Sequence, residues 1–379
     1  MRDIDQIRAD ITATDRNMKE LFLRRMSLAE EVADNKLARG DKILKPDREE
    51  ALLVSLCQDL PDDLKQSFSS VLKATIRTSR THQYQRILQK HPESFSLDIA
   101  QRTLSPKNVF YQGMPASYQY GAAKQLFPKA NLYAAETFEQ VFQKVSAKEA
   151  DVGIVPVENS TAGAINEVYD LLIKYNLHIS HSIIMRIQHC LAAAKGTAFS
   201  DINTVYSHPQ ALGQCQNFLA AHQFEAQAMS NTAVAAHFIA QGHDRCGAAI
   251  CSEAAADFYG LVPLRLQIND GEYNQTRFIA VTRELTAADT DNRISLMFTL
   301  PHTTGSLSSA LSIFSDYESN LTEIHSRPLA ETPWTFRFYV DFTGNILHYP
   351  TRCLLYQLFE ELPEVRLLGC YSVSHCDKE

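Results

Sequence analysis

Residues 158–163 combine side chains that could bind and activate a small polar molecule. Glu158 carries a carboxylate, Asn159 an amide, and Ser160 and Thr161 carry hydroxyls, directly after the apolar run 152–157. The run predicts a buried strand, and apolar residues at helical spacing follow from Ile165. A polar turn at a helix N-terminus offers free backbone N–H groups to an anion. An ordinary strand-to-helix turn has the same spacing, so the pattern alone leaves both interpretations open.

Basic residues near the start of the chain form a second candidate site. Apolar residues on alternating three- and four-residue steps predict one long helix over residues 1–39 with a heptad seam. Arg25 interrupts this seam, and a charge there is costly unless it is paired or serves a ligand. Arg8 and Lys36 lie on a neighbouring stripe, about 42 Å apart along a straight helix. One helix therefore cannot bring both cations to one small molecule.

Two further helices should position this basic cluster. Gly40 ends the long helix, Pro46 suits the first turn of a second, and Pro61 opens a third that Pro92 ends. The third helix should bury an apolar face: Leu64, Phe68, Val71, Leu72, Thr75 and Ile76. Three helices, one of them very long, cannot bury the heptad seam within one compact chain.

Strands and helices alternate between residues 107 and 285, which predicts a mostly parallel sheet with helices on its faces. One strand ends at the polar turn 207–210, before a helix that carries Gln214 and Cys215. Asn231 should cap another helix. After a polar linker over residues 286–292, the order β-α-β-β-α-β predicts a ferredoxin-like unit.

The stretch Val-Pro-Val-Glu-Asn-Ser-x-x-Gly at residues 155–163 closely resembles a signature of prephenate dehydratase. With Thr276-Arg277-Phe278 and the flanking segments, nearly the whole chain resembles the bifunctional P-proteins, in which chorismate mutase is fused to prephenate dehydratase. The resemblance implies a multidomain protein: an all-α chorismate mutase (1–92), a linker (93–106), a two-lobed α/β dehydratase (107–285) and a ferredoxin-like α+β ACT domain (292–376). It implies two steps of phenylalanine biosynthesis, chorismate to prephenate and prephenate to phenylpyruvate, with L-phenylalanine as inhibitor.

The first of these reactions is a pericyclic rearrangement that needs no acid, base or nucleophile. The protein must hold a dicarboxylate in a compact conformer and stabilise charge on the ether oxygen, which calls for fixed cations. The resemblance assigns catalysis to Arg25 and Lys36, and substrate binding to a set of seven residues: Arg8, Arg25, Lys36, Arg48, Glu49, Ser79 and Gln83. Lys45 replaces the family's usual Asp, which puts substrate orientation in question. The family's helical mutase interlocks two chains, so we expect a homodimer or a higher homo-oligomer.

For the second reaction the resemblance gives Thr276 the central role, near the hydroxyl that leaves. A free threonine is a poor acid, so Glu158 is the alternative proton source. The implied supporting contacts are Asn159, Ser160, Ser207, His208, Gln214, Arg277 and Phe278. In the family's turn at 113–119, Ala116 replaces a glycine and Gln119 a serine. We expect alanine to hold that turn only with a negative φ.

The resemblance also places a phenylalanine site in the C-terminal domain. Its two motifs match eight residues: Gly305, Ser306, Leu307, Ser308, His325, Ser326, Arg327 and Pro328. His325 stands where the family has Glu, and a neutral imidazole attracts an ammonium less than a carboxylate does. We therefore expect phenylalanine to bind, more weakly than usual. A purely structural dimerisation module is the alternative.

Composition sets wider limits. The 379 residues are 45% hydrophobic and 21% charged, which is typical of a globular protein of two or three domains, and the net charge of −8 argues against nucleic acid as a partner. No apolar run is long enough to span a membrane and the N-terminus is polar, so we expect a cytoplasmic protein. The eight cysteines lack a Cys-x-x-Cys pair, and the 13 histidines lack metal-ligand spacing. We expect reduced thiols, no metal and no cofactor.

Two other functions fit parts of the chain. A monofunctional dehydratase with a degenerate mutase arm would explain Lys45, although every expected cation is present. A non-enzymatic two-lobed solute-binding protein with a sensor domain is the other alternative, and Thr276 in its motif argues against it.

Overall fold

The computed structural model describes residues 2–102, 105–271, 273–329 and 335–376. The chain forms two compact units. The first comprises Met1–Asp98 with Leu296–Arg366, and the second comprises Ile99–Ser295 with Leu367–Glu379. No helix in the described part of the chain is both long and apolar enough to cross a bilayer.

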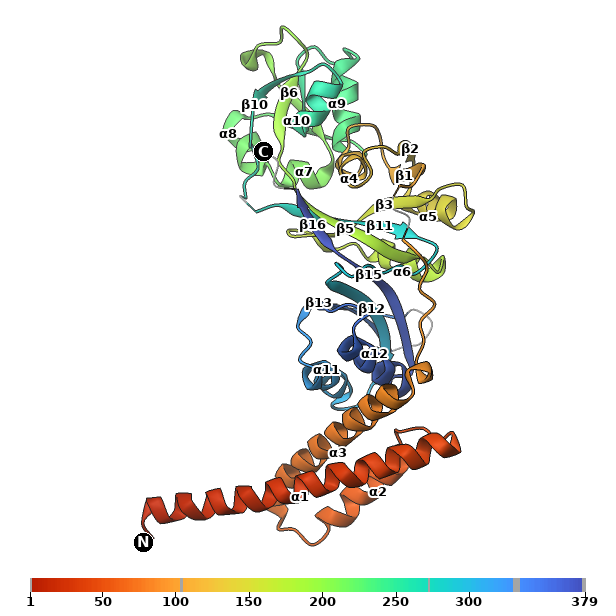
Figure 1. Ribbon diagram of the computed structural model, residues 1–379. Coiled ribbons are helices and arrows are strands. Elements are labelled where there is room, and N and C mark those ends of the chain that lie inside the picture. Colours follow the sequence, from red (N-terminus) through yellow and green to blue (C-terminus); the bar gives the residue numbers. More distant parts are fainter. Residues whose placement is uncertain (1, 103–104, 272, 330–334, 377–379) are drawn as a thin grey trace. The chain divides into compact units, whose positions relative to one another are not determined.

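Three helices open the first unit, as predicted: α1 (Ile4–Arg39), α2 (Pro46–Cys57) and α3 (Asp62–Lys90) (Figure 1). Helix α1 ends at Gly40, whose φ of 68° allows its N–H to bond back to the carbonyls of the last turn. Pro46 lies in the first turn of α2, where a missing N–H costs nothing. Acidic residues follow in the first turns of α2 and α3, where they complement the helix dipole.

Much of the apolar surface of these helices is exposed in the single chain. Six apolar residues of the α1 seam are between 36% and 65% exposed: Ile4, Ile11, Met18, Leu21, Leu28 and Val32. The prediction that α3 buries its whole apolar face is wrong for one chain: Leu64, Phe68 and Val71 are 51%, 38% and 55% exposed, whereas Ile76 is buried. The reason is that α2, which contacts α3, leaves these three side chains uncovered.

The first unit also contains most of a βαββαβ module. Its elements are β12 (Arg293–Leu300), α11 (Ser306–Asp316), β13 (Leu321–Pro328), β14 (Phe336–Thr343), α12 (Tyr349–Glu361) and β15 (Glu364–Tyr371). The sheet order is β13-β14-β12-β15. Helix α3 packs against α11 and α12, and a short 3-10 turn (Pro92–Ser94) follows it. The helical module and the βαββαβ module therefore share a packed interface.

One lobe of the second unit has the strand order β5-β11-β3-β1-β2. Its strands are β1 (Asn108–Gln112), β2 (Asn131–Ala135), β3 (Val152–Asn159), β5 (His178–Arg186) and β11 (Gln275–Thr282), with helices α4 (Tyr118–Leu126), α5 (Phe138–Ser146) and α6 (Asn166–Lys174). Strands β1, β2 and β3 are parallel, while β11 runs antiparallel to both β3 and β5. The chain thus returns to this lobe through β11.

The other lobe has the order β10-β6-β9-β7-β8. Its strands are β6 (Cys190–Ala193), β7 (Thr204–Ser207), β8 (Glu225–Ala228), β9 (Gly247–Cys251) and β10 (Val262–Arg265). Its helices are α7 (Pro209–Gly213), α8 (Gln216–His222), α9 (Thr232–Ala240) and α10 (Glu253–Phe258), with a 3-10 turn at Phe199–Asp201. Gln214 and Cys215 lie between α7 and α8, whereas the sequence predicted a single helix through them.

Three further features differ from the predictions. Both sheets are mixed rather than mostly parallel, because β11, β6 and β10 pair antiparallel with their neighbours. The polar run after residue 157 does not cap a helix: β3 extends through Asn159, a short strand β4 (Gly163–Ala164) pairs back with it, and α6 begins without a side-chain cap. A last strand, β16 (Val373–Cys376), pairs parallel with β5.

Candidate active sites

A cavity of about 220 Å³ lies among the three helices of the first unit. It is lined by six of the seven residues predicted for the mutase: Arg25, Lys36, Arg48, Glu49, Ser79 and Gln83. Lys45 and Arg80 also line it. The seventh residue, Arg8, does not. Its side chain is 72% exposed near the start of α1, 3.4 Å from Asp5.

Neutral oxygen atoms hold the two central cations of this cavity. The Arg25 guanidinium donates to the carbonyl of Thr75 at 3.1 Å and to the Ser79 hydroxyl. Lys36 Nζ donates to the carbonyl of Ile43 at 2.6 Å. Burial lowers the pKa of Arg25, which Glu49 opposes, and burial followed by the charges of Lys45 and Arg48 lowers the pKa of Lys36. The positive charge of both groups is therefore positioned without a carboxylate in hydrogen-bond contact, which suits an anionic ligand.

Gln83 adds an amide oxygen that can still accept a hydrogen bond. Its amide N–H donates to the carbonyl of Ser79 at 3.1 Å, while its buried Oε1 has no hydrogen-bond partner among the described residues. Such an atom costs roughly 1–3 kcal/mol unless something pairs with it. Lys45, in contrast, bonds to Asp41 at 2.9 Å on the exposed side. Gln83 is therefore better placed than Lys45 to meet a ligand.

A second cavity, of about 320 Å³, lies between the two lobes of the second unit. Its lining includes five of the predicted dehydratase residues: Asn159, His208, Gln214, Thr276 and Phe278. Asn159 and Thr276 face each other across the β3–β11 pair, and the other lobe supplies His208 and Gln214. Both lobes thus contribute polar groups to one enclosed space.

The hydroxyl of Thr276 is oriented by Asn159. Asn159 Oδ1 accepts the backbone N–H groups of Thr161 and Ala162 at 3.1 and 3.0 Å, which fixes the orientation of the amide. Its Nδ2 then donates to Thr276 Oγ1 at 2.9 Å and to Asn274 Oδ1 at 2.9 Å. Because Thr276 accepts from Asn159, its own hydroxyl hydrogen is available to a group in the cavity.

A neutral histidine extends this network. His189 Nε2 lies 3.2 Å from Gln214 Oε1, and its Nδ1 lies 3.2 Å from the Tyr118 hydroxyl. Burial lowers the pKa of His189 to about 4, against the hydrogen bond to Gln214, which raises it. Gln214 also accepts from Asn274 at 2.9 Å. The imidazole is therefore uncharged at neutral pH and joined through amides to Thr276.

Helix N-termini replace cations in this cavity. No lysine or arginine is among the residues that line it. The first residues of α4, α7 and α9 line it instead, with Ser117, His208 and Asn231 as their N-caps. N-terminal N–H groups and the helix dipole favour anions, and three such ends meet here.

Four predicted dehydratase residues do not line this cavity. Glu158 and Arg277 occupy the opposite face of the β3–β11 pair from Asn159 and Thr276, because side chains alternate along a strand. Arg277 Nε lies 3.4 Å from Glu158, and its Nη1 donates to the Tyr371 hydroxyl at 3.1 Å. Glu158, the predicted alternative proton source, is therefore not among the residues that line this cavity.

The other two are serines bonded to the backbone. The Ser207 hydroxyl is fully buried and donates to the carbonyl of Ile250 at 2.7 Å. The Ser160 hydroxyl donates to the carbonyl of Tyr273 at 3.0 Å and accepts from Gln275 N at 2.9 Å. Both brace loops beside the cavity rather than face it.

Ala116 corrects another expectation. Its φ is 64°, so alanine holds the left-handed conformation that the family's glycine would hold. That conformation is allowed for alanine at a cost of roughly 1–2 kcal/mol. The turn keeps its shape, and Gln119, the second departure, lies in the cavity lining.

The two predicted effector segments lie on different elements. Gly305, with φ of 84°, is the N-cap of α11, and Ser306 to Ser308 form its first turn. His325 to Pro328 form the last half of β13. The His325 ring stacks on Tyr339 with 5.0 Å between centroids, and its Nδ1 lies 3.5 Å from Glu323.

Sequence reasoning missed several residues of the second cavity, among them Tyr118, His189, Gln210 and Thr232. The sequence predicted that Asn231 caps a helix. It did not show that the start of this helix also lines the cavity. His189 carries no local motif, because its position depends on the crossing of the chain between β5 and β6. In the first cavity, the missed residue was Arg80.

Comparison with known proteins agrees with both cavities. A model of chorismate mutase type II matches residues 7–84, and a model of prephenate dehydratase matches residues 109–286. The bifunctional chorismate mutase/prephenate dehydratase of Escherichia coli strain K12 is 32% identical over 96% of this chain and 95% of its own length. Arogenate dehydratase/prephenate dehydratase 2 of Arabidopsis thaliana is 36% identical over 70% of this chain and 72% of its own.

Among solved structures, prephenate dehydratase of Arthrobacter aurescens in complex with L-Phe is 27% identical, with a TM-score of 0.64. The match covers 70% of this chain and 90% of the chain of that structure. The fold and cavities thus define a protein with a helical mutase-type module and a two-lobed dehydratase-type domain. The chain belongs to the family of bifunctional chorismate mutase/prephenate dehydratases.

Proposed function

We propose that this chain converts chorismate to prephenate in the helical cavity and prephenate to phenylpyruvate, water and carbon dioxide in the two-lobed cavity. Its domains are residues 1–92, 107–285 and 292–376, and it acts in the cytoplasm. The observation that supports this best is the convergence of the predicted residues on two separate cavities, one in each unit.

The helical cavity suits a pericyclic reaction. Arg25, Arg48 and Lys36 surround a space in which a dicarboxylate can be held compactly, which lowers the entropic part of the barrier. Lys36 stabilises the charge that develops on the ether oxygen, with the Gln83 amide as second contact. The remaining cation, Arg8, comes from a second copy of the chain, since it lies far along α1 from this cavity.

The two-lobed cavity suits loss of a hydroxyl together with a carboxylate. As the bond to the departing carboxylate breaks, its electron pair enters the ring and the ring hydroxyl leaves, so the ring becomes aromatic. Thr276 donates a hydrogen bond to the leaving oxygen, which takes up one proton from solvent and departs as water. Helix N-termini hold the carboxylates without adding a cation that would oppose the loss of carbon dioxide.

The βαββαβ module is an ACT-type regulatory domain that binds L-phenylalanine. Gly305 brings the backbone N–H groups of the first turn of α11 close to a carboxylate, and exposed Leu307 meets the aromatic ring. Phenylalanine inhibits the dehydratase by favouring a conformer that binds it better than the active one does.

Assays on the purified chain test the proposal. Chorismate and prephenate are supplied separately, and phenylpyruvate is followed by absorbance with and without L-phenylalanine. Phenylpyruvate should form from either substrate. Formation from prephenate alone would leave a dehydratase with an inactive helical module. Formation from neither would refute the dehydratase activity, and chorismate that is also not consumed would refute the mutase activity.

A further inference from the structure

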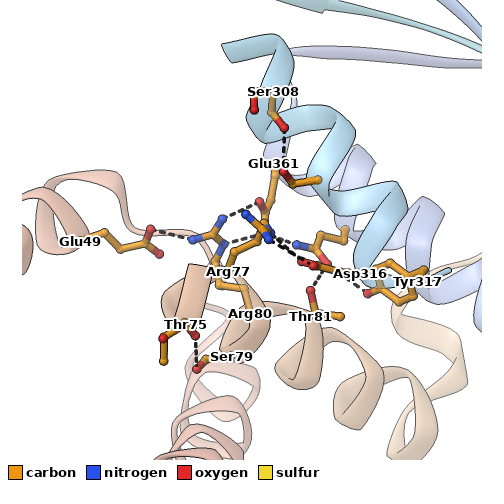
Figure 2. A network of polar contacts seen from close by, with 12 residues as sticks. Glu49, Thr75, Arg77, Ser79, Arg80, Thr81, Ser308, Asp316, Tyr317 and Glu361 are labelled. Carbon is orange, nitrogen blue, oxygen red and sulfur yellow. Dashed lines mark hydrogen bonds and ion pairs between the residues drawn. The ribbon is translucent and has the colours of Figure 1, made fainter. Parts of the chain in front are cut away.

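Helix α3 carries a buried arginine that joins the mutase cavity to the βαββαβ module. Arg80 Nη1 donates to Glu49 Oε2 at 2.7 Å, and its Nε and Nη2 donate to Glu361 of α12 at 2.8 and 3.1 Å (Figure 2). The Arg80 side chain is 13% exposed and that of Glu361 is 5% exposed. All three guanidinium nitrogens therefore donate hydrogen bonds, two to the carboxylate of Glu361 and one to that of Glu49.

The charges of this cluster favour a fixed arrangement. Burial opposes the charge of Arg80, but the Glu361 hydrogen bonds and the nearby Glu49 outweigh it and raise the pKa of Arg80. Burial raises the pKa of Glu361, and Arg80 counteracts that rise. A guanidinium shared between two carboxylates and held bidentate by one of them has little freedom to move.

Glu49 lines the mutase cavity together with Arg80. There its charge acts on both Arg25 and Lys36, whose pKa values it raises against the effect of burial. Without Arg80, the carboxylate of Glu49 would be free to turn toward these cations and compete with the carboxylates of the substrate. Arg80 prevents this by holding one oxygen of Glu49 on the α3 side of the cavity.

We propose that Arg80 is a positioning residue of the mutase, which fixes Glu49 and is itself anchored by Glu361, so that the βαββαβ module is part of the framework of the mutase site. This rests on the proposed role of Glu49 in the mutase. Although Arg80 also lines the cavity, its three guanidinium nitrogens are bonded to Glu49 and Glu361, so Arg80 acts through Glu49.

Arg77 supplies a matched control on the same helix. It lies three residues before Arg80 and donates to both carboxylate oxygens of Asp316, the last residue of α11, at 2.6 and 3.2 Å (Figure 2). It too holds α3 against the βαββαβ module, but it is not among the residues that line the mutase cavity. Its replacement weakens the same interface and leaves the Arg80–Glu49 contact in place.

The experiment measures mutase and dehydratase kinetics separately on the full-length chain. Loss of a hydrogen bond to a charged group predicts a fall in mutase kcat/KM of about 10- to 100-fold for Arg80→Ala, mainly through KM. Arg77→Ala should change mutase kcat/KM by less than about 3-fold, because it leaves the Arg80–Glu49 contact in place. Arg80→Lys keeps the charge but reaches only one carboxylate, so its loss of mutase kcat/KM should lie between those of Arg80→Ala and Arg77→Ala. Dehydratase kinetics with prephenate should be unchanged in all three, which also reports on folding.

A double-mutant cycle separates positioning from simple support of the interface. In a Glu49→Ala background, Arg80→Ala should cause little further loss, because the group that it positions is already absent. Equal losses for Arg80→Ala and Arg77→Ala, or losses that multiply with that of Glu49→Ala, would overturn the proposal.

If Arg80→Ala does not fold, Arg80→Lys and Glu361→Gln decide, and normal mutase kinetics in both would overturn it. If Glu49→Ala leaves mutase kcat/KM unchanged, the proposed role of Glu49 is refuted, and that of Arg80 is refuted with it. If Glu49→Ala lowers mutase kcat/KM and Arg80→Ala does not, only the role of Arg80 is refuted.

Discussion

At the scale of single residues, the proposed dehydratase mechanism depends on the direction in which the Thr276 hydroxyl donates. Asn159 accepts two backbone N–H groups with its oxygen and must therefore donate to Thr276 with its nitrogen. This leaves the Thr276 hydrogen for the leaving oxygen of the substrate. The poor acidity of threonine is then less limiting, since the leaving group is stabilised by a fixed donor in a site partly closed to water.

Thr276→Val tests this arrangement, because valine has nearly the same shape and lacks the hydroxyl. We expect dehydratase kcat to fall by at least about 100-fold, the usual contribution of a positioned proton donor. Thr276→Ser should retain most of the activity, and mutase kinetics should not change. Normal phenylpyruvate formation from prephenate by Thr276→Val would remove Thr276 from the mechanism.

His189 predicts a pH dependence of stability. Its pKa is lowered to about 4 in the folded chain, below the ordinary value of 6.5. The unfolded chain therefore binds the extra proton first as pH falls, so the contribution to stability is present above pH 6.5 and is lost as pH falls toward 4. Between pH 7.5 and pH 5 this loss amounts to about 2 kcal/mol.

His189→Gln should therefore show a drop in unfolding free energy between pH 7.5 and pH 5 that is about 2 kcal/mol smaller than in the parent chain. Urea unfolding of the second unit, followed by circular dichroism at both pH values, measures it. His243→Gln on the exposed surface is the matched control and should leave the drop unaltered. An equal drop in parent and His189→Gln would show that His189 does not cause it.

The sequence predicted that Thr276 and Asn159 belong to one site, and both line the cavity. It could not predict which of their neighbours line the cavity as well. Glu158 and Asn159 are adjacent in a motif, yet strand alternation places only one of them in the cavity. The sorting required knowing that β3 continues through Asn159, and the polar run suggested that it had ended. Ser207 was misplaced for a related reason, since its bond to Ile250 depends on a strand from elsewhere in the chain.

At the scale of elements, helix ends were the most predictable features. Gly40, Pro46 and Asn231 each mark a boundary where local chemistry decides the backbone. Strand direction was less predictable, because whether a strand pairs parallel or antiparallel depends on distant partners. Strand β16 was missed altogether, since four residues near the end of the chain carry no pattern of their own.

The N-terminus of α11 carries the prediction for phenylalanine. Gly305 has φ of 84° with open space around it, so a side chain there meets no neighbour but forces strained backbone. Gly305→Val should weaken L-phenylalanine binding by at least about 10-fold, since the left-handed conformation costs an ordinary residue roughly 1–2 kcal/mol and more when it is β-branched. Titration calorimetry on the full chain measures the affinity.

Gly242→Val is the control for backbone strain in general. Gly242 has φ of 75°, also with open space around it, in the other unit of the chain. Its substitution should leave phenylalanine affinity unchanged. Parent-like affinity in Gly305→Val, or equal weakening in both variants, would place the effector site away from α11.

At the scale of the whole molecule, a single chain leaves two predicted features of the mutase unmet. Arg8 lies outside the cavity, and most apolar residues of the α1 seam between Ile4 and Val32 are exposed. A second copy that packs its α1 antiparallel on this seam would cover the apolar surface and deliver its own Arg8 to the cavity. One symmetric contact would then supply both the missing burial and the missing charge, with two shared sites per dimer.

Mixing inactive variants tests whether the site is shared. Arg8→Ala and Lys36→Ala chains should each lack mutase activity, yet after unfolding and refolding together half of the dimers are mixed, and each mixed dimer has one site with both residues intact. We expect about a quarter of the parental mutase activity to return. Arg25 and Lys36 line the same cavity from one chain, so a mixture of Arg25→Ala with Lys36→Ala should regain nothing. Dehydratase activity monitors refolding throughout, and an Arg8→Ala/Lys36→Ala mixture that recovers dehydratase but no mutase would mean that each chain builds its mutase site alone.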